Sequence, residues 1–465
     1  ILITVLSAMA AVFLFLALLA LEPCASLKFV GEAEDEFHGG DQVSRPNRVS
    51  VNYLWPSGRG QVAHYTTSES QAPVNLTASF AWTWHDPRGR YATSPVGTVI
   101  DDKQNIYLTS LDSIRKFDQW GKLLWEYKPT RNIGEELPNT ASLYNGAVYG
   151  STTSGRVFAV SMDSGRELWS NKVKSIGGRN GWVSVFDGIV ITGSDAKKMT
   201  SHDQEVTGLK ASNGSVVWHF RPDAPISNFM GSFAGDGTFI FQDYEGRAYR
   251  CRASNGQLLW KSGGTIGTLT DGSALMGPNG KVYTVNAHQR KDKPGEVSAY
   301  NFQDGTLLWK TTVPHPPHNM PAIGKLARHT GLSVVQPIGL PGRKGSPTDV
   351  WALDAETGEV QWIFNGPTQK GFQQAGEGTI ARATRALTGV QPTTTPSTWS
   401  APSIDGLGTV YIGNEEGQIF ALRDEDGDKK VAGAHEVSMY NANAAFSAGS
   451  SPAIGKDMIA MASID

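Results

Sequence analysis

The sequence has little cysteine, little charge and no strong charge imbalance. Of 465 residues, two are Cys and 18% are charged, and the formal net charge is −3. This balance gives no overall attraction to nucleic acid or to an anionic membrane surface, so neither is expected as a partner. Cys24 lies beside an apolar N-terminal run, so we expect the folded part to hold one thiol, Cys251, and no disulfide.

Glycine and tryptophan are abundant by contrast. The chain contains 52 Gly, 24 Pro and 13 Trp. A composition rich in Gly and aromatic residues and poor in charge is typical of many short strands joined by tight turns. The length is sufficient for one large β domain, and we therefore expect an all-β protein.

The N-terminal segment is almost wholly apolar. Residues 1–21 carry no charged side chain, and the run is long enough to span a bilayer. A stretch of small residues, 24–26, follows it and resembles a cleavage site. We predict that residues 1–26 form a signal peptide or a membrane anchor, with both alternatives open. Either one directs the chain into a secretory pathway, to an extracellular or periplasm-like compartment, with membrane contact through this segment alone.

The next segment lacks any sustained period. Residues 27–75 begin with an acidic cluster and continue with Gly, Ser, Pro and Asn. Such a composition does not bury enough apolar surface to order itself, so a flexible tether is predicted here. The folded domain is then expected over residues 76–465, with an insertion at 365–399.

A repeated pattern dominates the rest of the chain. In each unit a Gly is followed four residues later by a Trp, and most of these glycines follow a turn-forming residue. Glycine supplies the positive φ of a tight turn, so each unit predicts a hairpin with a large aromatic on its second strand. The pairs are Gly121/Trp125, Gly165/Trp169, Gly214/Trp218, Gly256/Trp260, Gly305/Trp309 and Gly358/Trp362, and after Gly427 the corresponding residue is Val431.

The spacing of these units indicates the architecture. Successive tryptophans are 42 to 53 residues apart, and two further apolar strands precede each hairpin. Four short strands in a period somewhat above 40 residues are typical of a β-propeller blade. Seven units have their own glycine turn, and an eighth begins after residue 450 without its outer strands. Residues 79–84 read as an outer strand without inner ones, and Trp82 precedes Trp125 by 43 residues.

These ends lead to a prediction about ring closure. Joining residues 79–84 to the C-terminal strands would close the ring and remove exposed sheet edges. We therefore predict an eight-bladed propeller of four-stranded antiparallel blades, closed by N- and C-terminal strands. A seven-bladed ring is the alternative.

Residues 350–362, with the sequence VWALDAETGEVQW, resemble the PQQ-type repeat of quinoprotein alcohol dehydrogenase-like β-propellers, as do residues 155–169 and 417–422. The resemblance covers nearly the whole folded part. It implies eight blades stabilised by tryptophan docking, a role that would fall on Trp82, Trp125, Trp169, Trp218, Trp260, Trp309 and Trp362. The family includes dehydrogenases that use pyrroloquinoline quinone (PQQ). It also includes non-enzymatic members, such as the propeller lipoprotein of the bacterial outer-membrane β-barrel assembly machine.

The repeat specifies a fold, so the activity has to be judged from the site. The resemblance implies that a dehydrogenase would carry an adjacent Cys pair beside its cofactor and a calcium held by Glu, Asn and Asp. No two Cys are adjacent here, and no such ligand set is matched. The acidic stretch 424–428 aligns with the hairpin turn of the repeat. We therefore expect a chain closer to the non-enzymatic members, with no catalytic residue, cofactor or metal.

Two alternatives stay open. A branch of sugar dehydrogenases lacks the Cys pair, so a PQQ- and calcium-dependent alcohol or sugar dehydrogenase is the first. A carbohydrate-binding propeller that uses exposed aromatics such as Trp399 is the second.

The long loops predict where a partner would bind. They follow second or fourth strands, which end on the same face of a propeller, and they are rich in basic residues. We expect a protein or peptide partner, favoured by charge to be acidic, and solvated loops are the plain alternative. The residues are Lys197, Lys198, Arg290, Lys291, Lys293, Arg343, Lys344 and Lys370.

Overall fold

The computed structural model describes residues 53–63, 65–87, 97–129, 135–173, 182–194, 204–226, 229–264, 274–288, 293–317, 319–339, 345–369, 387, 399–446 and 451–463, and in backbone alone residues 3–7 and 268–269. Within these ranges all named elements are strands. They include no helix that is long and apolar enough to cross a membrane.

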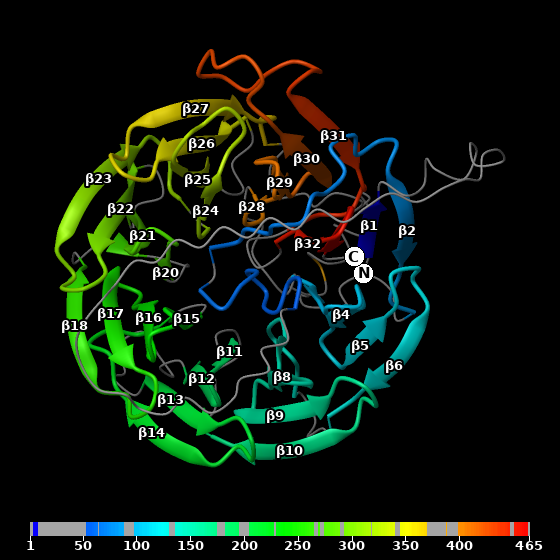
Figure 1. Cartoon of the computed structure of the whole chain (residues 1–465), viewed down its shortest axis with the longest axis vertical. Coiled ribbons are helices and arrows are strands. Elements are labelled where there is room, and N and C mark those ends of the chain that lie inside the picture. Colours follow the sequence, from blue (N-terminus) through cyan, green and yellow to red (C-terminus); the bar gives the residue numbers. More distant parts are fainter. Residues whose placement is uncertain are drawn as a thin grey trace, which may run out of the picture.

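The strands form a ring of sheets around a central axis (Figure 1). Seven of the sheets are each built from one continuous stretch of chain, and we number them as blades 1 to 7. The first four are blade 1 with β3 (Val99–Ile100), β4 (Ile106–Thr109), β5 (Ile114–Phe117) and β6 (Leu123–Tyr127); blade 2 with β7 (Ser142–Tyr144), β8 (Ala147–Ser151), β9 (Arg156–Ser161) and β10 (Glu167–Lys172); blade 3 with β11 (Val183–Phe186), β12 (Ile189–Ser194), β13 (Glu205–Lys210) and β14 (Val216–Phe220); and blade 4 with β15 (Ser232–Phe233), β16 (Thr238–Gln242), β17 (Arg247–Arg252) and β18 (Leu258–Gly263).

The other three continuous blades follow in chain order. Blade 5 departs from four strands, because β19 and β20 both pair with β21. The three are blade 5 with β19 (Thr268–Leu269), β20 (Leu275–Met276), β21 (Lys281–His288), β22 (Gly295–Asn301) and β23 (Leu307–Val313); blade 6 with β24 (Ala322–Lys325), β25 (Leu332–Gly339), β26 (Thr348–Asp354) and β27 (Val360–Asn365); and blade 7 with β28 (Ser403–Ile404), β29 (Val410–Gly413), β30 (Gln418–Leu422) and β31 (Val437–Asn441).

The ring is closed by a composite sheet. Its order is β2 (Phe80–Trp84), β1 (Ile3–Ser7), β33 (Met458–Ala462) and β32 (Ala453–Gly455), all antiparallel. The predicted outer strand at 79–84 is thus present, but β1 lies between it and the C-terminal strands. This β1 comes from the segment that the sequence analysis assigns to a signal peptide or anchor. The rest of residues 1–26 lies outside the described residues.

The predicted count of eight like blades therefore requires correction. Seven blades are formed by the repeat, each from a single stretch of chain, which is the count given above as the alternative. The closing sheet is assembled from three separate segments, and one blade has five strands rather than four. The physical reason is that the chain after blade 7 supplies only two strands, so the remaining edge pairs with strands from elsewhere.

Burial falls from the axis outward. All five residues of β8 and of β16 are buried, because middle strands are covered on both sides by neighbouring blades. Outer strands are half exposed, as β10 and β18 show. A blade is a meander, so its first and third strands end on one face of the ring and its second and fourth strands on the other. We call these the hairpin face and the insertion face.

At six junctions, an indole of one outer strand lies over the turn glycine of the next blade. Its Nε1–H donates to a backbone carbonyl of that turn at 2.7–3.1 Å. A Cβ built on each glycine would lie 2.3–2.9 Å from a ring atom, and each glycine has a positive φ, so no other residue fits without strain. The pairs are Trp82/Gly121, Trp125/Gly165, Trp169/Gly214, Trp218/Gly256, Trp260/Gly305 and Trp309/Gly358.

The junction between blades 6 and 7 differs. Trp362 is buried, yet its Nε1 has no hydrogen-bond partner, and the space around Gly427 is open. In place of the indole contact, the backbone of Ile363 exchanges hydrogen bonds with Lys429 and Val431. The alignment of Val431 with the tryptophans is also wrong. The residue opposite Ala421 on the outer strand is Ser438, because the connection between β30 and β31 is much longer than a tight turn.

A comparison of two turn glycines tests whether the indole contact holds blades together. Gly358→Ala and Gly427→Ala both place an alanine at positive φ, which destabilises by about 1–2 kcal/mol. Only Gly358→Ala also drives a Cβ into an indole, that of Trp309, at 2.6 Å. We expect its free energy of unfolding to fall by a further ~1–3 kcal/mol, measured by denaturant titration. Equal losses in the two variants would contradict a stabilising role for the contact.

Residues 53–63 and 65–72 form an inner lining of the ring, which we call the axial segment. It lies within the ring in Figure 1, and its backbone hydrogen bonds follow the blade order around the axis. Each contact joins one residue of the segment to the innermost strand of a blade. The contacts are Trp55 to Ile100 in blade 1, Pro56 to Leu143 in blade 2, Val62 to Phe233 in blade 4, Ala63 to Met276 in blade 5, Tyr65 to Ile323 in blade 6, and Thr66 and Ser68 to Ile404 in blade 7.

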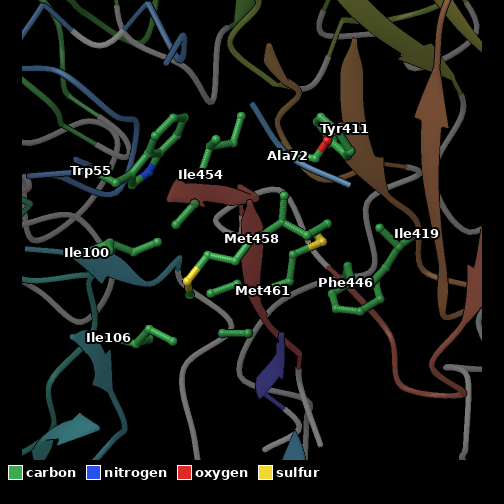
Figure 2. Close-up of a cluster of buried hydrophobic side chains, with 14 of the residues drawn as sticks. Trp55, Ala72, Ile100, Ile106, Tyr411, Ile419, Phe446, Ile454, Met458 and Met461 are labelled. Carbon is green, nitrogen blue, oxygen red and sulfur yellow. Dashed lines mark hydrogen bonds between the residues drawn. The ribbon is translucent and has the colours of Figure 1, made fainter. Parts of the chain in front are cut away.

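The axial segment continues to the closing sheet. The backbone N–H of Asp457, between β32 and β33, donates to Gln71 at 2.9 Å, and the Tyr411 hydroxyl donates to Ala72 at 3.0 Å. Figure 2 shows Trp55 and Ala72 among buried side chains of blades 1 and 7 and of the closing sheet. The prediction of a flexible tether over 27–75 is therefore wrong for residues 53–75. Residues 27–52 lie outside the described residues.

Removal of one side chain tests the contribution of the axial segment. Trp55 is fully buried in the core cluster at the closing sheet. We expect Trp55→Ala to lower the free energy of unfolding by about 3–5 kcal/mol, as for other buried large-to-small changes. Trp120→Ala is the matched control, because Trp120 is 63% exposed and its loss should change stability by about 0.5 kcal/mol or less. A Trp55→Ala variant as stable as this control would show that the segment does not support the ring.

Candidate partner-binding face

The predicted basic residues follow strands that end on the insertion face. β12, β21 and β25 are second strands and β27 is a fourth strand, and these end at Ser194, His288, Gly339 and Asn365. Among the basic residues only Lys293 is described, and it is exposed just before β22. Lys197, Lys198, Arg290, Lys291, Arg343, Lys344 and Lys370 lie outside the described residues.

Several of the described cations on this face are paired with acids. In blade 1 the buried Arg115 contacts Glu126 at 2.6 Å and Asp86 at 3.5 Å, and its guanidinium lies 5.0 Å from the Trp84 ring centre. In blade 5 Lys310 contacts Glu296 at 2.9 Å. These pairs cancel locally, so the described part of the face has no marked positive excess, and the basic field stays a prediction.

Blade 4 has a similar network at its second turn. Arg247 contacts Asp243 at 2.9 Å, and the Tyr249 hydroxyl donates to the same carboxylate at 2.7 Å. Burial raises the pKa of Asp243, although hydrogen bonds from Arg247 and Tyr249 oppose the shift. Lys261 contacts Asp223 at 2.6 Å. Arg247 also lies 3.6 Å from Asp223, so the network links the turn to Lys261 on the outer strand β18.

Glu415, in the second turn of blade 7, stands apart from these pairs. The residue is 2% exposed, and neither of its carboxylate oxygens has a hydrogen-bond partner. Burial, with a smaller repulsion from Glu416, raises its pKa to about 8. A buried carboxyl without partners is stable only when protonated, so this side chain is neutral at physiological pH.

A stability measurement against pH tests this assignment. Because the pKa of Glu415 is raised on folding, its protonated form favours the folded state, and that contribution is lost as pH rises from about 4.5 through 8. We expect Glu415→Gln to match the wild type near pH 5 and to exceed it by a few kcal/mol near pH 9. Glu69→Gln, at an exposed site, serves as the control. Parallel stability curves for the wild type and Glu415→Gln would rule out the raised pKa.

Among the described residues, a small cavity lies on the axis next to the axial segment. It is too narrow to hold a water molecule and is lined by Pro56, Ser57, Val62 and residues of β7, β11 and β15. Ligand pockets are usually about 300–1,000 Å³. The lining includes no charged side chain to meet the carboxylates of PQQ, and the buried Arg59 is not part of it. This cavity does not fit the cofactor.

The thiol and the metal-ligand group that an enzyme could use each have a structural explanation. Cys251 is buried on β17, and burial raises the pKa of its thiol to about 12, so it is unreactive at neutral pH. Among the described residues, one group has metal-ligand spacing, Asp426, His435 and Glu436. Both oxygens of Glu436 accept backbone N–H groups, of Glu425 and Ala432, which gives this side chain a role in ordering its loop.

The carbohydrate alternative relied on an exposed Trp399. The prediction that this side chain is exposed is wrong. Trp399 is 1% exposed and packs edge-on against Phe420 at 5.6 Å between ring centres. It is a core residue of blades 6 and 7, because the strand-like bridge to Asn414 directs it inward.

A family model described as "Outer membrane protein assembly factor BamB" matches residues 110–264, 178–345 and 245–462. The chain belongs to this family. The resemblance to PQQ-type propellers drawn from the repeat is thereby confirmed.

Two curated relatives are similar to parts of the chain. Quinoprotein alcohol dehydrogenase PedH of Pseudomonas putida is 23% identical over 44% of this chain and 36% of its own length. Outer membrane protein assembly factor BamB of Nitrosomonas eutropha is 22% identical over 48% of this chain and 52% of its own length. The chain thus spans about half or less of the relatives it matches.

Solved structures support the fold. BamB from Moraxella catarrhalis is 12% identical with a TM-score of 0.53, covering 80% of this chain and 96% of that chain. Quinohemoprotein alcohol dehydrogenase from Comamonas testosteroni is 13% identical with a TM-score of 0.59, covering 86% and 75%. Both likenesses concern the propeller fold alone.

Proposed function

We propose that this chain is a non-catalytic propeller scaffold that binds a protein partner through its insertion face, in a periplasmic or other envelope compartment. Support comes from membership of a family described by an outer membrane protein assembly factor, and from a relative of that name. A propeller that recruits proteins presents loops on one face of its ring, and the long loops of this chain follow strands that end on the insertion face.

The observation that carries the non-catalytic half is the axial segment. It bonds to the innermost strands of six blades, and the cavity beside it, among the described residues, is too narrow for a water molecule. A cofactor on the axis would have to displace Trp55, Pro56 or Val62 from these contacts. The chain therefore favours a structural axis over a catalytic one.

A PQQ-dependent dehydrogenase is the second candidate, favoured by the similarity to PedH. The full chain is incubated with PQQ and calcium and assayed for dye-linked oxidation of alcohols and sugars. We expect neither turnover nor a rise in melting temperature, since a ligand that binds the folded state raises stability by mass action. Turnover or a PQQ-dependent rise in melting temperature would replace the scaffold proposal with the enzyme.

Site-specific photo-crosslinking tests the binding face. Lys293 and Asp304 belong to the same blade and are both exposed, but Lys293 precedes β22 on the insertion face and Asp304 lies in the hairpin turn. A photo-reactive residue at position 293 should capture a protein partner in the native host, and one at position 304 should not. Capture from position 304 alone would place the binding surface elsewhere.

Charge reversal tests the electrostatic half of the proposal. Arg290, Lys291 and Arg343 changed together to Glu should slow association with the captured partner by about tenfold or more, because opposite charge steers encounter. The unfolding free energy should stay within ~0.5 kcal/mol. Association is also expected to weaken with added salt, which screens such fields over about 8–10 Å. Unchanged association rates would remove the acidic partner from the proposal.

A further inference from the structure

The closing sheet holds its third strand in a different way from the blades. In each of blades 1 to 7, the strand next to the outer edge is followed directly in the chain by the outer strand itself. In the closing sheet, residues 8–79 separate β1 from β2, and β33 lies far along the chain from β1. Pairing with four residues of β2 and five of β33 therefore keeps β1 in place without a hairpin (Figure 1).

The strand on one side of β1, the outer strand β2, has anchors of its own. The Trp82 Nε1–H donates to the Gln119 carbonyl of blade 1 at 2.9 Å, and the indole covers the turn glycine of that blade. Toward blade 7, the Phe80 ring stacks on Tyr440 with 5.7 Å between the ring centres. These contacts join β2 to both neighbouring blades and do not involve β1.

The strand on the other side, β33, is also anchored elsewhere. It pairs with β32, and the hydroxyl of Thr98, just before β3, donates to the Ala460 carbonyl at 3.1 Å. All five residues of β33 are buried. Both neighbours of β1 are therefore fixed independently of it, so its departure leaves a slot one strand wide with an unpaired backbone edge on each side.

The residues of β1 have a second predicted use. They lie in the uncharged apolar run 1–21, which is long enough to span a bilayer and is predicted to be a signal peptide or membrane anchor. A segment that is cleaved off or inserted in a bilayer cannot pair with β33 at the same time. Targeting and ring closure therefore compete for residues 3–7, and the targeting use empties the slot.

We propose that the slot between β2 and β33 accepts an extended apolar strand from a protein partner, antiparallel to both, in place of β1. The strand seated there shows what fits, since its sequence ITVLS has five residues and no charge. Backbone hydrogen bonds to two open edges supply affinity, as in other cases of strand addition. The apolar cluster around the slot, which includes Met458, Ile459 and Met461, favours apolar side chains over charged ones.

An open slot also needs an occupant for physical reasons. With β1 gone, β2 and β33 each present a row of N–H and C=O groups, and a free apolar edge of this kind promotes aggregation. A strand inserted between them pairs with both rows at once, which a single free edge does not offer. The proposal rests on the predicted targeting role of residues 1–21 and is independent of the insertion face.

Peptide binding to the full chain tests the slot. The Val5→Pro variant lacks the backbone N–H in the middle of β1, which weakens its pairing. A fluorescent peptide of residues 1–8, with a lysine tail for solubility, is titrated against this variant and the wild type and followed by anisotropy. We expect binding at least tenfold tighter to Val5→Pro, because β1 competes from the same chain at high effective concentration. A peptide with the same proline should bind neither chain. Equal affinity of the two chains, or of the two peptides, would overturn the proposal.

Disulfide formation in a defined register locates the bound strand. In the pairing of β1, position 4 stands opposite Thr83, an exposed residue of β2. A peptide with Cys at position 4 should form a disulfide with a Thr83→Cys chain at least tenfold faster than with a Thr312→Cys chain, measured by mass spectrometry. Thr312 is the matched control, because it is an exposed threonine on the outer strand β23, whose inner neighbour β22 is joined to it by a hairpin.

The crosslinking chains do not depend on the folding of Val5→Pro. Both retain β1, so excess peptide has to displace it, and both carry a substitution at an exposed site that should change stability little. Preferential crosslinking to Thr83→Cys, increased further when Val5→Pro is added, supports strand exchange. Equal crosslinking at the two sites would show that the slot does not take up a strand and would reject the proposal.

Discussion

The innermost strands of the blades converge on the axis, and the edge that each presents there has to be covered. In this chain the axial segment covers these edges. Its backbone forms one or two hydrogen bonds with each of six blades in turn. Because buried N–H and C=O groups are strongly destabilising when unpaired, this circuit satisfies edges that would otherwise face a wet or empty channel. The ring's centre is thereby a hydrogen-bonded and apolar core, which limits what else it can hold.

The outer part of the ring depends on a different device. An indole that rests on a glycine and donates to the same turn combines a large apolar contact with a satisfied polar group. The device requires a residue without Cβ at one place and a flat aromatic at another, so each unit carries both in fixed spacing. Where one half is displaced, as at Trp362 and Gly427, the junction needs another solution, and the longer β30–β31 connection provides it with backbone bonds.

This explains how much of the molecule could be predicted from its sequence. The Gly-to-Trp spacing located the hairpins of six blades, because the turn glycine and the outer-strand Trp of one hairpin are only four residues apart, although each contacts a different neighbouring blade. Val431 was misplaced because an insertion keeps the turn glycine but moves the outer strand to Val437–Asn441. The axial segment gave no periodic signal. Its residues pair singly with different blades, so neither a period of two nor a hydrophobic run develops.

The same reasoning separates the two faces of the ring. Several charges of the insertion face are matched in pairs, as in Arg247 with Asp243, and such pairs order turns without producing a long-range field. At the blade 6–7 junction the acids order turns as well: Asp424 accepts the Gly427 N–H and lies 3.1 Å from His329, and Asp354 accepts two backbone N–H groups of its own turn. A ring whose axis is filled therefore tolerates departures from the repeat at its junctions, where local hydrogen bonds replace the indole contact, that the axis does not tolerate.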